Sequence, residues 1–169
     1  MSTISLSDLE FISREDLAKH MQTQPSGLPH NIAVVDVRDS DHIGGHIKGS
    51  TWVPSNELDY KTPELIRTMK GKDIVVFHCA LSQQRGPSAA LRYLREKERL
   101  DPTTWTESKG EVEEKGEQVQ KKEEGEGSGK EKKQRVVVLR GGFTQWQEKY
   151  GADEKLTEGW QKDIWEFGY

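Results

Sequence analysis

The protein has 169 residues, of which 32% are hydrophobic and 32% charged, and its formal net charge is −4. This length fits one domain with extensions, and the slight acidity argues against nucleic acid as a main partner. No apolar run approaches the roughly 20 residues of a membrane helix, and the N-terminal stretch MSTISLSDLEF lacks the features of a secretory signal. Because Cys79 is the single cysteine, no internal disulfide can form, and a reducing compartment, the cytoplasm or also the nucleus, is expected.

The first half of the chain predicts one helix and two strands. Ser13 followed by Asp16 resembles a capping box, so a helix is expected from there to about Gln22. Ile32–Asp36 (IAVVD) is short, apolar and β-branched, which is typical of a buried strand. After a glycine-rich loop, residues 51–53 (TWV) predict a second, short strand.

The second half repeats the alternation of helices and strands. Pro63 suits the first position of a helix, and residues 73–77 (DIVVF) predict a central parallel strand. A helix is then expected over residues 86–99, followed by a buried strand at Arg135–Leu139 and a helix opened by two glycines. This order indicates an α/β domain with a central, mainly parallel sheet flanked by helices.

The domain organisation is predicted as a single domain over residues 1–169 that carries an insertion and a tail. Residues 107–133 contain nine Glu, seven Lys and five Gly, so they cannot bury enough surface to offset their ordering entropy. We expect them to form a flexible charged insertion. Residues 152–169 form a C-terminal tail, whose aromatic side chains are expected to pack on the domain surface. They are Trp160, Trp165, Phe167 and Tyr169.

The stretch HCALSQQRGP carries the candidate chemistry. It lies between the strand DIVVF and the next helix, at the edge of a parallel sheet where ligands bind. A turn of this kind can direct backbone N–H groups at one oxyanion and favour the thiolate form of Cys79, while the planar fork of Arg85 matches two phosphate oxygens. In the competing interpretation, Cys79 is a small core residue and Arg85 a surface residue. The predicted oxyanion-binding loop consists of Ala80, Leu81, Ser82, Gln83, Gln84 and Arg85.

Three further residues are candidates for supporting this loop. His78 is expected to orient the loop rather than act as a base, because a thiolate needs no base. Asp36 and Arg38 either support the loop from behind or form a structural ion pair. No metal site is predicted, since one cysteine cannot make a Cys/His zinc cluster.

Three stretches of the sequence resemble one known family. HCALSQQRGP resembles the active-site loop of the rhodanese-fold cysteine phosphatases of the M-phase-inducer class and of the related eukaryotic arsenate reductases. DVRDSDHIGGHIKGS and LRGGF resemble two further stretches of that family. The resemblance implies a rhodanese-like domain in which Cys79 is the nucleophile and Arg85 binds the oxyanion. Sulfurtransferases of this fold generally have a loop one residue shorter, so the loop here suits a tetrahedral oxyanion better than a persulfide.

The resemblance leaves several activities open. The first expectation is a phosphatase of the protein tyrosine or dual-specificity type, acting through a Cys79 phosphoenzyme. Ala80 and Gln84 stand where M-phase-inducer loops carry glutamate, so aryl phosphates, with their better leaving groups, are favoured. The alternative is an arsenate reductase, which needs no bound cofactor but an external thiol such as glutathione, with glutaredoxin as a candidate partner. A thiosulfate-type sulfurtransferase and a non-catalytic oxyanion-binding module come after these.

Overall fold

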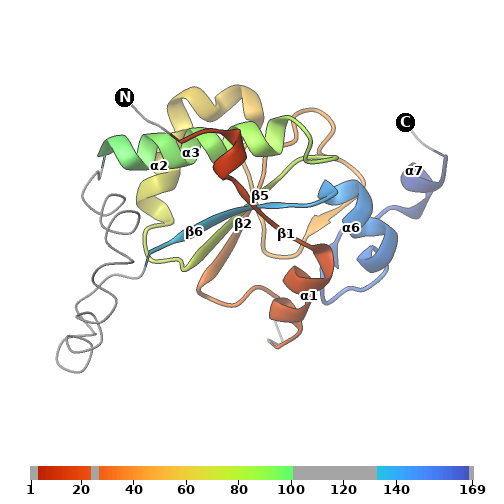
Figure 1. Ribbon diagram of the computed structural model, residues 1–169. Coiled ribbons are helices and arrows are strands. Elements are labelled where there is room, and N and C mark those ends of the chain that lie inside the picture. The colour runs from red at the N-terminus through yellow and green to blue at the C-terminus, as the bar shows by residue number, and fades with distance from the viewer. Residues whose placement is uncertain (1–3, 24–26, 101–132, 168–169) are drawn as a thin grey trace.

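The computed structural model describes residues 4–23, 27–100 and 133–167, and a five-stranded sheet lies at the centre of the domain (Figure 1). All strand pairs in this sheet are parallel, and the spatial order is β1-β6-β5-β2-β4. This arrangement confirms the expected α/β class. The strands are β1 (Glu10–Ile12), β2 (Ile32–Asp36), β4 (Thr51–Trp52), β5 (Ile74–His78) and β6 (Arg135–Leu139).

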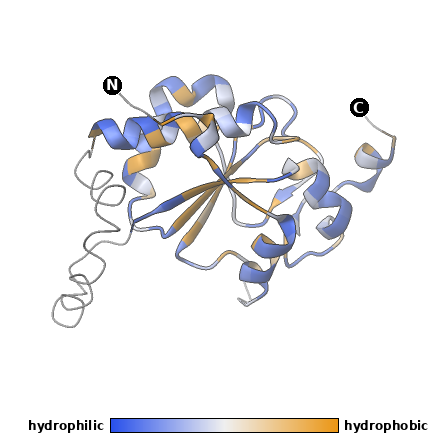
Figure 2. Ribbon diagram, viewed as in Figure 1, coloured by the Kyte–Doolittle hydropathy of each residue, from blue (hydrophilic) through white to orange (hydrophobic). Residues whose placement is uncertain are grey.

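Helices cover both faces of the sheet, as Figure 1 shows. Successive residues of a strand point to opposite faces. In β2, Ala33 and Val35 therefore join one half of the core, whereas Ile32 and Val34 join the other. Because both faces are buried, the strands are apolar along most of their length, which Figure 2 shows as orange at the centre. The helices are α2 (Leu58–Thr68) and α3 (Arg85–Leu100) on one face, and α1 (Arg14–Gln22) and α6 (Gly142–Tyr150) on the other.

The element boundaries follow the sequence pattern closely, with one correction. The Ser13 hydroxyl accepts the Asp16 N–H (3.0 Å) at the start of α1, as a helix cap should. The prediction that a helix starts at Pro63 is wrong, because α2 begins at Leu58, after a 3₁₀ turn η2 (Ser55–Glu57). Pro63 removes the N–H that would pair with the carbonyl of Asp59, and Asp59 is exposed, so water can satisfy that carbonyl.

The C-terminal tail packs on the domain through a small second sheet. In it, β3 (His46–Ile47) pairs antiparallel with β7 (Thr157–Glu158), and α7 (Lys162–Phe167) follows. The Trp165 ring lies 5.5 Å from that of Phe143, and its indole N–H donates to the Gly44 carbonyl (2.9 Å). The expected packing of the aromatic tail is thus confirmed for Trp165. It is wrong for Phe167, which is 79% exposed.

A 3₁₀ turn, η1 (Leu6–Asp8), precedes β1. The predicted charged insertion, residues 107–133, lies outside the described residues except at its last position, and Tyr169 of the tail also lies outside them. Within the part of the chain that the structure describes, no helix has the length and apolar character to cross a membrane.

Candidate active site

The Cys79 thiol lies at the base of the loop that joins β5 to α3. Its side chain is almost fully buried, and its sulfur accepts the backbone N–H groups of Ser82 (3.2 Å) and Gly86 (3.3 Å). Two backbone donors thus converge on one atom at the start of α3, which is the arrangement that backbone N–H groups make around a bound anion. Cys79 also belongs to one of the two core clusters, so it is buried as the competing interpretation expects, with its sulfur directed at the loop donors.

Ser82 gives the loop its shape. Its φ of 57° is left-handed, which is uncommon for a residue other than glycine and folds the chain back toward Cys79. The Ser82 hydroxyl accepts the backbone N–H of Cys79 (3.4 Å), so it braces the loop and makes no hydrogen bond to the sulfur itself. Around it, Ala80 is half-buried, and the side chains of Leu81, Gln83 and Gln84 are exposed.

Arg85 stands at the first position of α3, with its guanidinium held by two carboxylates. The Asp41 oxygens accept from Nη1 (2.9 Å) and Nη2 (2.6 Å), and an Asp39 oxygen also accepts from Nη1 (3.1 Å). These hydrogen bonds hold the pKa of Asp41 down at about 2, and together with the charge of Cys79 they raise the pKa of Arg85. The structure thus places Arg85 close enough to Cys79 for the charge of Cys79 to act on it, as expected. The Arg85 guanidinium, however, donates its hydrogen bonds to Asp39 and Asp41.

The sequence interpretation missed both Asp39 and Asp41. One signal could have found them, because both lie in the short segment after the end of the strand Ile32–Asp36. The carboxyl ends of parallel strands meet at one edge of a sheet, and the Cys79 loop leaves β5 at that same edge. Acidic residues placed there can reach an arginine at the start of α3.

Asp36 and Arg38 form an ion pair behind the loop. Both side chains are fully buried, and Arg38 Nη2 lies 2.6 Å from Asp36 Oδ2. Burial opposes ionisation of Asp36, but His78 and Arg38 outweigh it and hold the pKa of that carboxyl below its ordinary value. Arg38 also donates to the carbonyls of Ile43 (3.3 Å) and Gly45 (2.9 Å), so the pair fixes the loop that carries Asp39 and Asp41.

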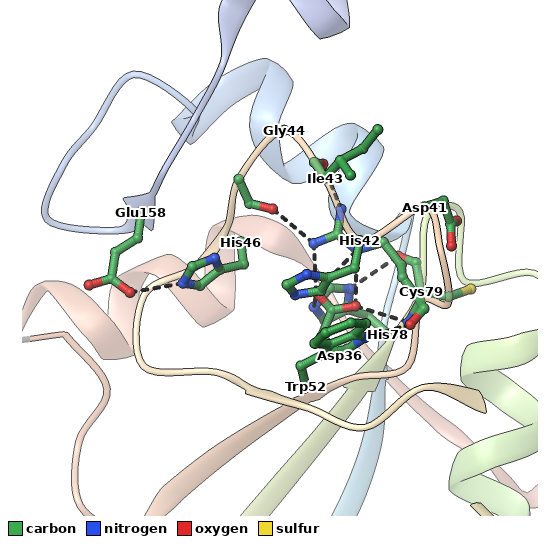
Figure 3. Close-up of polar contacts among 12 residues, drawn as sticks. Asp36, Asp41, His42, Ile43, Gly44, His46, Trp52, His78, Cys79 and Glu158 are labelled. Carbon is green, nitrogen blue, oxygen red and sulfur yellow. Dashed lines mark hydrogen bonds and ion pairs between the residues drawn. The ribbon is translucent and has the colours of Figure 1, made fainter. Parts of the chain in front are cut away.

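His78 links this pair to the nucleophile. It is fully buried, burial lowers the pKa of its ring, and its Nδ1 lies 3.0 Å from the Cys79 carbonyl, to which it donates. Its Nε2 lies 3.8 Å from Asp36 Oδ2. Figure 3 shows His78 and His42 gathered around the Asp36 carboxylate, with Cys79 beyond them. His78 thus contacts the loop backbone on one side and faces Asp36 on the other, and its role in orienting the loop stays a prediction.

The start of α6 also holds the backbone of the Cys79 loop. The N–H groups of Phe143 and Thr144 donate to the carbonyls of Cys79 and Ala80, each at 2.9 Å. Gly142 has a left-handed φ of 61°, and a Cβ there would lie 2.6 Å from the Cys79 carbonyl oxygen and closer still to that of Ala80. The two glycines of LRGGF therefore let α6 approach the loop backbone.

Gly142→Ala is expected to destabilise the protein and to disturb the loop. The left-handed backbone alone costs about 1–2 kcal/mol for a residue with a Cβ, and the contact with the loop carbonyls adds to it. Urea unfolding measures the loss, with Gly71→Ala as the matched control, because a Cβ at Gly71 meets nothing within 4 Å. Equal unfolding midpoints for the two variants would contradict this role of Gly142.

Comparisons with known proteins agree with this fold. A family model described as a rhodanese-like domain matches residues 13–149, and the chain belongs to the rhodanese-like domain family. The chain is 33% identical to "CDC25-like phosphatase YCH1" of Saccharomyces cerevisiae, over 98% of this chain and 99% of that protein. It is 53% identical to "Arsenate reductase 2.2" of Oryza sativa subsp. japonica over 64 residues, which are 37% of this chain and 49% of that protein.

One solved structure has a similar fold. It is the crystal structure of Saccharomyces cerevisiae Ygr203w, described as a homolog of single-domain rhodanese and the Cdc25 phosphatase catalytic domain. It aligns with a TM-score of 0.65 at 33% identity, over 98% of this chain and 97% of that chain. The family resemblance that three short motifs predicted is confirmed.

Proposed function

We propose that the protein is a cysteine-dependent phosphatase of the protein tyrosine or dual-specificity type, with Cys79 as its nucleophile. The observation that carries the proposal is the buried Cys79 sulfur, which receives two backbone N–H groups beside the guanidinium of Arg85. The thiolate attacks phosphorus, so that an S–P bond forms while the bond to the leaving oxygen breaks. Water then cleaves the S–P bond and releases phosphate. The relative in Saccharomyces cerevisiae, described as a CDC25-like phosphatase, supports this assignment.

A hollow of ≈ 1070 Å³ adjoins Arg85 and runs along α3 as far as Arg99, and Cys79 is not among the residues that line it. Ser55, Leu58, Gln84 and Ser88 line the end beside Arg85, where the group that carries a phosphate ester could lie.

Arsenate reduction is the second candidate, and the identity to the arsenate reductase of rice favours it. The same thiolate would attack arsenic, and the resulting adduct must be resolved by a second thiol. Since Cys79 is the only cysteine, that thiol must come from outside, from glutathione or glutaredoxin. The single thiol also fits a reducing compartment, so we propose the cytoplasm, and also the nucleus, as its location.

One assay in parallel separates the two functions. The purified protein is given p-nitrophenyl phosphate in one arm, and arsenate with glutathione and glutaredoxin in the other. Release of nitrophenol that far exceeds arsenite formation is the expected result. The reverse order of rates would refute the phosphatase assignment.

Arg85→Lys is expected to raise KM for an aryl phosphate and to lower kcat. A lysine ammonium cannot make the paired hydrogen bonds of the guanidinium, and losing one charged hydrogen bond corresponds to roughly a tenfold to hundredfold decrease in kcat/KM. Steady-state kinetics measure both constants. Arg135→Lys, at an exposed position at the start of β6, is the matched control. Wild-type constants for Arg85→Lys would remove Arg85 from substrate binding.

A further inference from the structure

Asp41 occupies the fork of Arg85 in the way that a substrate phosphate would. Its two oxygens accept from Nη1 at 2.9 Å and from Nη2 at 2.6 Å, which is the paired geometry that guanidinium groups form with carboxylates and phosphates alike. A phosphate that binds to this fork must therefore take the place of the Asp41 carboxylate. The two anions compete for one cation.

The two carboxylates on Arg85 are anchored differently. Asp39 accepts the Ser55 hydroxyl (2.6 Å) and the Asn56 N–H (3.2 Å), both from the segment after β4. The anchor of Asp41 besides Arg85 is the N–H of Asp39 (2.8 Å), within its own turn. An oxyanion that takes the paired position on Arg85 therefore leaves Asp41 with one anchor, whereas Asp39 keeps two anchors and its contact with Nη1.

A displaced Asp41 carboxylate stays beside the oxyanion, because the backbone that carries it is held. Arg38 donates to the carbonyls of Ile43 and Gly45, and Trp165 donates to that of Gly44. The side chain can rotate, but the turn remains in place. Figure 3 shows Asp41 and the Cys79 sulfur at the same end of the site, and the charge of Cys79 acts on Arg85, the partner of Asp41.

We propose that Asp41 is the proton donor to the leaving oxygen, held on Arg85 until an oxyanion displaces it. This inference rests on the proposed phosphatase function. It also supplies what the loop lacks, since Ala80 and Gln84 offer no acid. Arg85 holds the pKa of Asp41 at about 2 in the free protein. When the guanidinium passes to the phosphate, Asp41 exchanges a neighbouring cation for a neighbouring anion, so its pKa rises and it takes up a proton from solvent.

Asp41 transfers a proton in each of the two chemical steps. As the Cys79 thiolate forms the S–P bond and the P–O bond breaks, Asp41 gives its proton to the leaving oxygen, which departs as a neutral alcohol or phenol. The resulting carboxylate accepts a proton from the water that attacks phosphocysteine. This second step restores the thiolate and releases phosphate, and no oxidant or reductant is involved.

The test compares leaving groups in Asp41→Asn, which keeps the shape of the side chain and one acceptor for Arg85. With phenyl phosphate, a poor leaving group, kcat/KM is expected to fall by about 10²–10⁴, the range of general acid catalysis. With 2,4-dinitrophenyl phosphate, whose leaving group needs no proton, it is expected to fall far less. Asp39→Asn removes the same charge from the same guanidinium and is the matched control. It is expected to keep the wild-type ratio between the two substrates.

Two outcomes would overturn the proposal. Equal losses on both substrates in Asp41→Asn, which keep their ratio at the wild-type value, would mean that Asp41 only positions Arg85. Wild-type kcat/KM on both substrates would mean that Asp41 has no part in the reaction. A wild-type protein that hydrolyses both substrates through Cys79 would leave the proposed function intact in either case. Failure of the wild type to hydrolyse dinitrophenyl phosphate would instead refute the function, and the role of Asp41 with it.

A binding measurement tests displacement without turnover. Tungstate, a tetrahedral oxyanion, is titrated into wild type, Asp41→Asn and Asp39→Asn in a calorimeter. Tungstate is expected to bind more tightly to Asp41→Asn than to wild type, because no anion must leave the fork. Equal or weaker binding would overturn the competition between Asp41 and the oxyanion.

Discussion

Cys79→Ser is expected to abolish turnover of aryl phosphates while it preserves oxyanion binding. Serine is close to cysteine in size, so the N–H groups of Ser82 and Gly86 still meet an acceptor at that position. A hydroxyl, however, is not ionised there and cannot attack phosphorus. Removal of a covalent nucleophile should lower kcat by a factor on the order of 10⁴ or more. Initial rates with p-nitrophenyl phosphate measure this loss, and tungstate calorimetry measures the retained binding.

The single cysteine provides an internal check on this result. An alkylating reagent such as iodoacetamide can modify only one thiol in the chain, and phosphate should protect that thiol by occupying the loop. Loss of activity in step with alkylation therefore reports on Cys79 in the native protein. A Cys79→Ser variant that is folded and retains wild-type turnover would sink the nucleophile assignment.

Asp36→Asn is expected to give the largest loss of stability among single changes at the site. Arg38 is fully buried, and its guanidinium depends on the Asp36 carboxylate for its charge balance. Removing one partner of a buried ion pair leaves the other charge uncompensated, which costs about 3–5 kcal/mol in the free energy of unfolding. Urea denaturation followed by circular dichroism measures the change.

An exposed pair supplies the control for that prediction. Glu10 and Arg135 are each 57% exposed and lie 3.3 Å apart, so Glu10→Gln should cost about 0–1 kcal/mol.

The loss in Asp36→Asn should also depend on pH. The folded protein lowers the pKa of Asp36 below its ordinary 3.8, so the stabilisation is complete above that value. This stabilisation decreases as the pH falls toward the lower pKa that Asp36 has in the folded protein. Equal losses for the two variants at neutral pH would contradict the buried-pair account.

Local sequence patterns predicted the buried strands well, and also the loop between β5 and α3. The buried strands at Ile32–Asp36 and Arg135–Leu139 have the predicted bounds, because a continuous β-branched run suits a sheet covered on both faces. Cys79 and Arg85 could be chosen as candidates because their spacing and their place between strand and helix are both local features. The short strand Glu10–Ile12 carried no such signal, since it lies at the edge of the sheet and none of its residues is buried.

Contacts between distant segments could not be predicted in the same way. Arg85 meets Asp41 only because two strands end at one edge of the sheet, and 44 positions of sequence separate them. The close approach of Gly142 to the Cys79 carbonyl likewise depends on how α6 packs on the loop. The sequence therefore indicated which groups could bind an oxyanion, whereas the structure was needed to show which groups already occupy the arginine.

The most direct test of Cys79 as nucleophile is to trap the covalent intermediate. The protein is mixed with 2,4-dinitrophenyl phosphate, quenched rapidly in denaturant during turnover, digested and analysed by mass spectrometry. We predict a phosphoryl group on the peptide that contains Cys79, and its absence from Cys79→Ser. Turnover at the same rate with no phosphorylated Cys79 peptide would contradict the phosphoenzyme mechanism.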